Sequence, residues 1–144
     1  MLSSEDMTWE TPQDFFDSLN VEFNFTLDPC ATKETAKCEK YFTPEIDGLS
    51  QSWENERVFM NPPYGSEISK WIKKASEQKN GIVVCLIPAR TDTKYFHEYI
   101  YNKPNVELRF IKGRLKFGGK QKGSGSAPFP SLIAVINHIE PYFD

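Results

Sequence analysis

The chain has no long hydrophobic run and no paired cysteine motif. Its longest apolar segments, 81–89 and 131–136, are far shorter than the roughly 20 residues that a membrane helix needs. The N-terminus lacks the charged-then-apolar pattern of a secretion signal. Cys30, Cys38 and Cys85 form no CxxC pair, which argues against a zinc site or a disulfide framework. We therefore expect a cytoplasmic protein with no membrane segment.

Histidine is also scarce, and the chain shows neither an internal repeat nor a linker. His97 and His138 have no carboxylate or cysteine at ligand spacing, so the sequence predicts no metal site and no histidine-based nucleophilic site. With 144 residues, of which 39% are hydrophobic, the chain fits a single domain that spans 1–144. The sequence does not indicate an oligomeric state.

Charge is distributed unevenly along the chain. Residues 1–60 carry 4 basic and 13 acidic side chains, whereas residues 61–144 carry 13 basic and 7 acidic ones. Between residues 109 and 122 there is no acidic residue but there are six basic ones, namely Arg109, Lys112, Arg114, Lys116, Lys120 and Lys122. This run predicts contact with a polyanion such as duplex DNA, the alternative being a solvated, mobile basic loop.

Strand and helix patterns alternate along the chain. Thr11 as N-cap and Pro12 at the first helical position predict a short helix over 13–19. Phe23, Phe25 and Leu27 alternate with polar residues, which predicts a strand that ends at Asp28-Pro29. Further strands are expected at 58–60, 82–87, 106–111 and 132–137, with an extra one at 114–117.

Helices are expected between these strands. Apolar residues recur at helical spacing in 68–75, and a second helix, capped by Thr91 or Asp92, carries the aromatic residues of 95–100. Gly118–Ser126 is expected to be a mobile loop. This order predicts a doubly wound α/β domain, in which a mostly parallel sheet has helices on both faces.

Two polar motifs follow predicted strands: Asp28-Pro-Cys-Ala31 and Asn61-Pro-Pro-Tyr64. Ligands of such folds bind at the carboxyl ends of the strands, so we expect both motifs on one edge of the sheet. The two prolines fix the backbone and remove two N–H donors. The carbonyl of Pro62 and the side-chain oxygen of Asn61 then form two rigid acceptors, and Tyr64 adds a flat face for a planar ring.

Such a site suits a conjugated amino group. The nitrogen of adenine or of an amide is a poor nucleophile, and two acceptors that bind its hydrogens stabilise the reactive pyramidal form. An alternative reading of Asn61-Pro-Pro-Tyr64 is a simple turn that ends a strand.

These motifs together resemble a known family. Asn61-Pro-Pro-Tyr64 is similar to the catalytic motif of S-adenosylmethionine-dependent amino-methyltransferases. The wider set resembles the phage-type Dam-like DNA adenine-N6 methyltransferases over roughly 9–137, through Thr11-Pro12, Leu27-Asp-Pro-Cys-Ala31, Asp47-Gly-Leu49 with Trp53, Pro88-Ala-Arg-Thr-Asp-Thr93, Lys112-Gly-Arg-Leu-Lys-Phe117 and Ala127-Pro-Phe-Pro-Ser131.

The resemblance implies a reduced Rossmann-like methyltransferase fold and a phage- or prophage-encoded enzyme of a bacterial host. It implies S-adenosylmethionine as cofactor and methylation of the N6 amino group of adenine in double-stranded DNA. The implied catalytic residues are Asn61, Pro62, Pro63 and Tyr64. The implied cofactor residues are Thr11, Pro12, Phe16, Asp28, Pro29, Cys30, Ala31 and Asp47. The expected DNA contacts are Arg90, which follows a predicted strand, and five residues of the basic run, Lys112, Arg114, Lys116, Lys120 and Lys122.

Several of these assignments have alternatives. Asp28 and Asp47 also fit ordinary turns, and capping or core packing also explains Thr11, Pro12 and Phe16. The loop at Asp28 departs from the family pattern because Pro-Cys-Ala replaces the expected glycines. Two other functions remain open: a methyltransferase that acts on protein glutamine or RNA, and a catalytically silent DNA-binding module.

Overall fold

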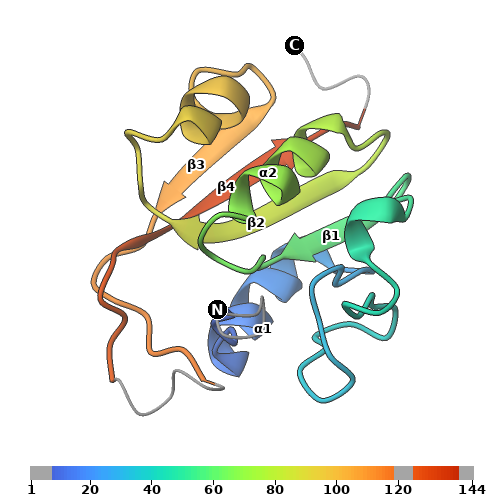
Figure 1. The fold of residues 1–144 in the computed structure, drawn as a ribbon, viewed down its shortest axis with the longest axis horizontal. Helices are drawn as coiled ribbons and strands as arrows, with labels where there is room; N and C mark the ends of the chain where they lie inside the picture. The colour runs from blue at the N-terminus through green and yellow to red at the C-terminus, as the bar shows by residue number, and fades with distance from the viewer. Residues whose placement is uncertain (1–7, 119–124, 140–144) are drawn as a thin grey trace.

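The fold is built on one four-stranded mixed sheet (Figure 1). The computed structural model describes residues 8–118 and 125–139. The strand order is β1-β2-β4-β3, where the strands are β1 (Arg57–Met60), β2 (Ile82–Pro88), β3 (Val106–Phe110) and β4 (Ser131–Asn137). β1 is parallel to β2, and β4 is antiparallel to both β2 and β3.

The prediction of a mostly parallel sheet is therefore wrong, although the α/β class is correct. A parallel neighbour requires a crossover connection, and only the β1–β2 pair has one, through a helix. In the described part of the 111–130 connection no helix is present, so β4 returns in the opposite direction and inserts between β2 and β3.

Helices lie on both faces of the sheet, as predicted. α1 (Gln13–Phe23) covers one face: Phe16 packs edge-on against Phe59 of β1 at 5.1 Å, and both oxygens of Glu22 accept from Arg109 of β3 at 2.7 Å. α2 (Ile68–Glu77) lies in front of the sheet in Figure 1, beside the π-helical turn η3 (Phe96–Ile100). None of the described helices has the length and apolar character of a membrane span.

The predicted strand over Phe23–Leu27 is largely absent. Phe23 instead ends α1, because Phe16, Leu19 and Phe23 share one buried face of that helix. Asn24 then terminates the helix in the left-handed conformation, with φ of 53°. Leu27 still forms an isolated parallel bridge with Val58, so Asp28 lies beside β1 where the sequence placed it.

Three local predictions also need correction, and a fourth is not tested. α1 has Pro12 at its N-cap and no side-chain cap, so Thr11 does not cap it. Thr93, rather than Thr91 or Asp92, accepts from the backbone of Phe96 at the start of the second helical segment. Residues 114–117 form no regular strand; only Gly118 forms a bridge, with Glu10. Most of the predicted mobile loop, 119–124, lies outside the described residues.

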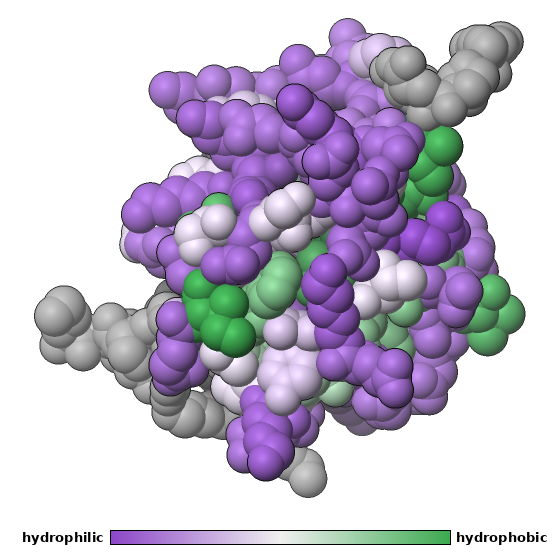
Figure 2. Space-filling model, turned by 90° about the vertical axis from the view of Figure 1, so that its right-hand side faces the viewer, coloured by the Kyte–Doolittle hydropathy of each residue, from purple (hydrophilic) through white to green (hydrophobic). Residues whose placement is uncertain are grey.

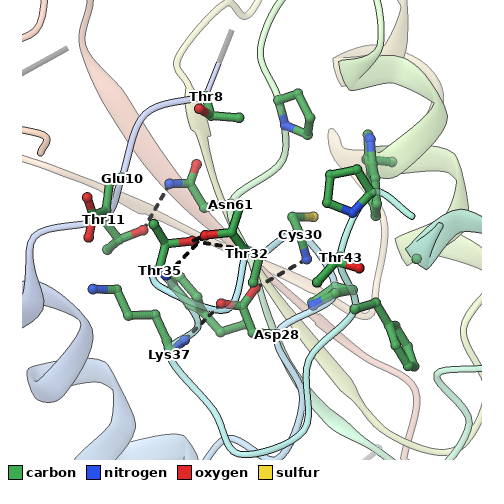
Figure 3. Close-up of a pocket in the computed structure, with 18 of the residues that line it drawn as sticks. Thr8, Glu10, Thr11, Asp28, Cys30, Thr32, Thr35, Lys37, Thr43 and Asn61 are labelled. Carbon is green, nitrogen blue, oxygen red and sulfur yellow. Dashed lines mark hydrogen bonds between the residues drawn. The ribbon is translucent and has the colours of Figure 1, made fainter. Parts of the chain in front are cut away.

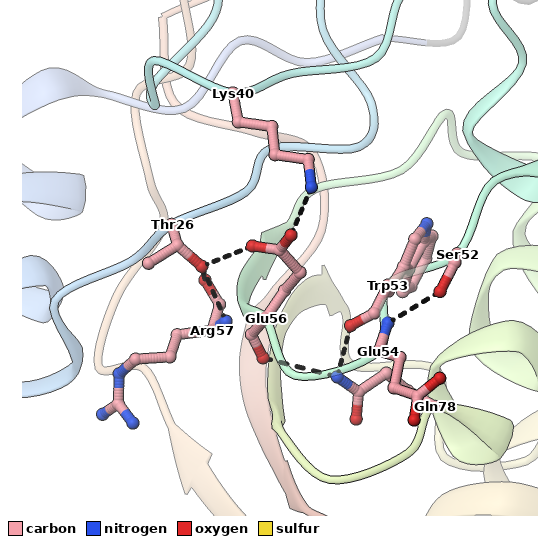
Figure 4. Close-up of polar contacts among 8 residues, drawn as sticks. All are labelled: Thr26, Lys40, Ser52, Trp53, Glu54, Glu56, Arg57 and Gln78. Atoms are coloured by element: carbon pink, nitrogen blue, oxygen red, sulfur yellow. Dashed lines mark hydrogen bonds and ion pairs between the residues drawn. The ribbon is translucent and has the colours of Figure 1, made fainter.

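The turn that leads into β1 is held by the polar network of Figure 4. Glu56 pairs with Lys40 and accepts a hydrogen bond from the Thr26 hydroxyl at 2.8 Å. The side chain of Gln78, just after α2, donates to the Trp53 carbonyl at 2.7 Å and to that of Glu56 at 3.3 Å. These contacts fix the start of β1 between the end of α2 and the segment that precedes Asp28.

One edge of the sheet collects the ends of four strands. β2 and β3 are both antiparallel to β4, so they run in the same direction as β1. The carboxyl ends of β1, β2 and β3 therefore meet the start of β4 at one edge. Asn61, Arg90 and Lys112 follow these three carboxyl ends, so the fold brings the predicted catalytic and DNA-binding motifs to the same side.

Candidate active site

A cavity of about 540 Å³ opens beside the carboxyl end of β1. Its volume lies within the roughly 300–1,000 Å³ typical of small-molecule and cofactor sites. Figure 2 shows the adjoining side of the molecule, where apolar and weakly polar side chains gather in the middle of a hydrophilic surface. The cavity is lined by three separate segments, 8–11, 28–49 and 59–71, through residues that include Trp9, Glu10, Thr11, Asp28, Pro29, Cys30, Ala31, Thr43, Asp47, Gly48, Asn61, Pro63 and Glu67.

Asp28 presents a buried carboxylate to this cavity (Figure 3). Its residue is only 5% exposed, and its two oxygens accept backbone hydrogen bonds from Cys30 at 3.2 Å and Lys37 at 3.0 Å. Burial raises the pKa of Asp28 to about 6, although the two N–H donors act in the opposite direction. A cationic ligand in the cavity would stabilise the ionised carboxylate in place of the hydration that burial removes.

The loop at Asp28 is held by the segment that follows it. The Asp28 amide donates to the Lys40 carbonyl at 3.0 Å, and the Phe42 amide donates back to the Asp28 carbonyl at 3.0 Å. The Ala31 amide also donates to the Phe42 carbonyl at 3.0 Å. Backbone hydrogen bonds to residues 40–42 thus fix the path of the loop at Asp28.

Asp47 and Gly48 close the cavity from the other side. Asp47 caps the short helix η2 (Gly48–Ser50) by accepting from the Leu49 amide at 3.3 Å, and its carboxylate is exposed at the cavity. A Cβ on Gly48 would lie 2.3 Å from the Pro29 carbonyl oxygen and 3.1 Å from the Trp71 ring. Gly48 therefore allows a close backbone approach to Pro29. The resemblance led us to expect glycines within the loop at Asp28 itself, but this glycine comes from a different segment.

Asn61 contributes an oriented amide to the cavity wall. Its Nδ2 donates to the Trp9 carbonyl and, at 2.9 Å, to the Thr11 hydroxyl oxygen (Figure 3). Because a carbonyl can only accept, this contact identifies the nitrogen side of the amide. The side-chain oxygen of Asn61 is buried and has no hydrogen-bond partner among the described residues. It is a fixed acceptor of the kind that the motif predicts.

The other residues of the motif support the wall. Pro63 lines the cavity, whereas Pro62 is buried and Tyr64 is only 5% exposed, with its hydroxyl donating to the Leu86 carbonyl at 3.1 Å. The Tyr64 ring belongs to an aromatic cluster in which it lies nearly parallel to Trp9 at 6.5 Å and meets Phe129 edge-on at 5.7 Å. Burial raises the pKa of Tyr64 well above its usual value, so its hydroxyl remains protonated.

The cavity and the neighbouring edge differ in charge. Among the described lining residues, Lys37 is opposed by five carboxylates, those of Glu10, Asp28, Glu34, Asp47 and Glu67. This lining favours a cation over a phosphate-bearing ligand. Arg90, Lys112, Arg114 and Lys116 are exposed, and Arg114 also donates to the Ala127 carbonyl at 3.2 Å. Lys120 and Lys122 lie outside the described residues.

Two predicted cofactor residues lie elsewhere. Pro12 is not among the lining residues, and Phe16 is in the core, 3% exposed and packed against Phe25 at 5.5 Å. Trp9, whose backbone carbonyl accepts from Asn61, was not predicted, because a main-chain contact leaves no pattern in side chains. Gly48 was not predicted either, although the Asp-Gly pair is a turn signal.

No group of three or more histidine, cysteine or acidic side chains in the described residues has the arrangement of a metal site.

A family model described as DNA N-6-adenine-methyltransferase (Dam) matches residues 1–142. The chain is 29% identical over 140 residues to the DNA N-6-adenine-methyltransferase of Haemophilus phage HP1 (strain HP1c1), which covers 93% of this chain and 80% of that protein. It is 33% identical over 102 residues to the DNA N-6-adenine-methyltransferase of Escherichia phage T1, which covers 68% of this chain and 42% of that protein. The chain therefore belongs to the DNA N-6-adenine-methyltransferase (Dam) family.

Proposed function

We propose that this protein transfers a methyl group from S-adenosylmethionine to the N6 amino group of adenine in double-stranded DNA. The single observation that carries the proposal is the buried side-chain oxygen of Asn61, which has no hydrogen-bond partner among the described residues and belongs to a residue that lines an acidic cavity of cofactor size. The family to which the chain belongs is described by the same reaction, N6 methylation of adenine in DNA. The phage origin of both relatives supports a phage- or prophage-encoded enzyme that acts in the cytoplasm of a bacterial host.

The described residues fit this cofactor. S-adenosylmethionine supplies an electrophilic methyl group on a sulfonium cation and also carries an ammonium group. In this proposal Asp28 attracts the cationic part, Pro29, Cys30 and Ala31 form the adjoining wall, and Asp47 contacts the ribose or adenine. The excess of carboxylates in the lining favours such a ligand.

Asn61 and Pro62 act on the target adenine. The adenine must leave the duplex, because its amino group is paired inside the helix. The Asn61 oxygen and the Pro62 carbonyl then accept from the amino group, which concentrates the lone pair of the nitrogen toward the methyl donor. Pro63 keeps the turn rigid, and Tyr64, whose ring is buried in the aromatic cluster, supports the turn from inside the protein. Orientation and these two acceptors supply the main part of catalysis.

The decisive experiment combines the purified protein with unmethylated DNA and S-adenosylmethionine that carries a labelled methyl group. Nucleoside analysis of the digested DNA should find the label in N6-methyladenosine. Labelled protein glutamine or RNA with unlabelled DNA would replace this substrate with one of the two other methyl acceptors. Salt-sensitive DNA binding without cofactor affinity would instead identify a catalytically silent DNA-binding module.

Cofactor binding should weaken below about pH 6. The pKa of the buried Asp28 is raised to about 6, so the carboxylate gains a proton and loses its attraction for a cation as the pH falls through that value. We expect the Kd for S-adenosylmethionine, measured by calorimetry between pH 5 and 8, to rise by up to about tenfold per pH unit below pH 6. Asp28→Asn should bind more weakly at pH 8 and show a flat profile.

Stability should respond to the same group with the opposite sign. An unfolded aspartate ionises near pH 4, so the ligand-free folded state holds the Asp28 proton more tightly than the unfolded state does. Its contribution to stability is therefore full below about pH 4 and is lost as the pH rises through 6.

A wild-type Kd for S-adenosylmethionine that is constant from pH 5 to 8 would contradict the role of Asp28 in cofactor binding.

The basic edge should control the salt dependence of DNA binding. Lys112 and Lys116 are exposed next to the edge that carries Asn61. If each neutralises one phosphate, replacing both by alanine should make the plot of log affinity against log salt shallower by about 1.8, measured by fluorescence anisotropy. Lys79 and Lys103 are also exposed but precede β2 and β3 at the opposite edge, so the matched double variant should keep the wild-type slope. Equal slopes for both double variants would show that Lys112 and Lys116 do not contact DNA phosphates.

A further inference from the structure

One short segment holds the amide nitrogen of Asn61. The Trp9 carbonyl and the Thr11 hydroxyl oxygen, both of residues 8–11, accept from Nδ2. We call residues 8–11 the entry segment, because it leads into α1. The two contacts occupy both hydrogens of the amide nitrogen, so they determine which way the side-chain oxygen points.

Among the described contacts, the Thr11 hydroxyl has no comparable role in the local fold. It is 5% exposed, yet α1 begins without a side-chain cap, and its first backbone bond runs from the Phe16 amide to the Pro12 carbonyl at 3.1 Å. A threonine before a helix would ordinarily cap it. Here the hydroxyl oxygen accepts from Asn61 instead.

The entry segment is itself anchored. The Gly118 amide donates to the Glu10 carbonyl at 2.9 Å. The Trp9 ring meets Phe117 and Phe129 edge-on, at 5.5 and 5.0 Å. The acceptors that hold Asn61 are therefore fixed from two sides, by a backbone bridge and by aromatic packing.

We infer that Thr11 is a positioning residue that keeps the Asn61 oxygen directed at the target amino group. This inference rests on the proposed function. An amide turned by 180° would present its NH2 group to an amino group, so donor would face donor. The Trp9 carbonyl, which only accepts, selects the productive orientation, and the Thr11 hydroxyl secures the second hydrogen. The resemblance-based view of Thr11 as a cofactor contact predicts a different kinetic effect.

Thr11→Val removes the acceptor while keeping the shape of the side chain. We expect kcat, measured with labelled S-adenosylmethionine, to fall by about tenfold while the Kd for the cofactor stays unchanged. Thr11→Ser restores the acceptor and should recover wild-type kcat. The control is Ser18→Ala, which removes an exposed hydroxyl that donates to the Phe15 carbonyl at 2.8 Å on α1, outside the cavity, and should leave kcat unchanged.

A double variant separates positioning from a general structural effect. In the Asn61→Ala background there is no amide to orient, so Thr11→Val should lower single-turnover methyl transfer no further. Additive losses would overturn the inference, as would an unchanged kcat in Thr11→Val or a failure of Thr11→Ser to recover it. A raised Kd at constant kcat would overturn it too and would make Thr11 a cofactor contact. If Asn61→Ala alone keeps full turnover, the catalytic role in the proposed function fails instead.

Discussion

Asn61→Ala is expected to bind S-adenosylmethionine with wild-type affinity and to lose nearly all methyl transfer. The substitution removes the buried oxygen that has no partner among the described residues. Loss of one preorganised group that stabilises developing charge costs on the order of 3 kcal/mol, so kcat should fall by about 10²–10³-fold. Calorimetry of cofactor binding and single-turnover transfer to DNA measure the two quantities separately.

The matched control for this variant is Asn105→Ala. Asn105 also donates through its amide to a backbone carbonyl, that of Asn137 at 3.2 Å, but it lies just before β3 at the opposite edge of the sheet. Its replacement should leave kcat unchanged. Wild-type turnover in Asn61→Ala would contradict the acceptor mechanism. Loss of cofactor binding together with turnover would show that Asn61 shapes the cofactor site.

The family and the central elements of the fold could be predicted from the sequence. The 82–87 strand is wholly apolar and the 68–75 pattern has clear helical spacing, and both elements are present as β2 and α2. The family prediction is confirmed by the match over residues 1–142. These signals are strong because each is carried by several neighbouring residues that share one buried environment.

Strand direction and element ends were harder to predict. Phe23 fits both a period of two with Phe25 and the end of a helical face, and the helical stripe of Phe16 and Leu19 decides in favour of α1. The antiparallel insertion of β4 depends on a connection whose described part contains no helix, and local patterns in β4 itself do not encode this. Both errors come from reading a short segment without the tertiary contacts that determine it.

The site was predictable in its motifs but not in its supports. Asp28 and Asn61 were found because each follows a predicted strand, and both line one cavity. Their supports act through the main chain: the Trp9 carbonyl orients Asn61, and the Lys37 and Cys30 amides bind Asp28. Any residue type supplies such groups, so sequence patterns do not reveal them.

Gly48→Ala is the second substitution with a large expected effect, because it acts on the wall of the proposed cofactor cavity. The new Cβ would lie 2.3 Å from the Pro29 carbonyl oxygen, a backbone atom that cannot move aside as a flexible side chain does. Overpacking of this kind costs about 1–3 kcal/mol. The loop at Asp28 must shift to relieve the clash, and displacements near 1 Å can cost about 100-fold in function. We expect cofactor affinity to fall by at least about tenfold in calorimetry, along with a lower Tm.

Gly125→Ala separates this clash from the general cost of replacing a glycine. Gly125 has φ of 71° and no atom within 4 Å of an added Cβ, so its substitution strains the backbone without contacting the loop at Asp28. It should lower Tm while leaving the Kd for S-adenosylmethionine unchanged. If Gly48→Ala also lowers only Tm, Gly48 does not shape the cofactor wall. A loss of affinity in Gly48→Ala alone would mean that the close approach of Gly48 to Pro29 takes the place of the glycines absent from the loop itself.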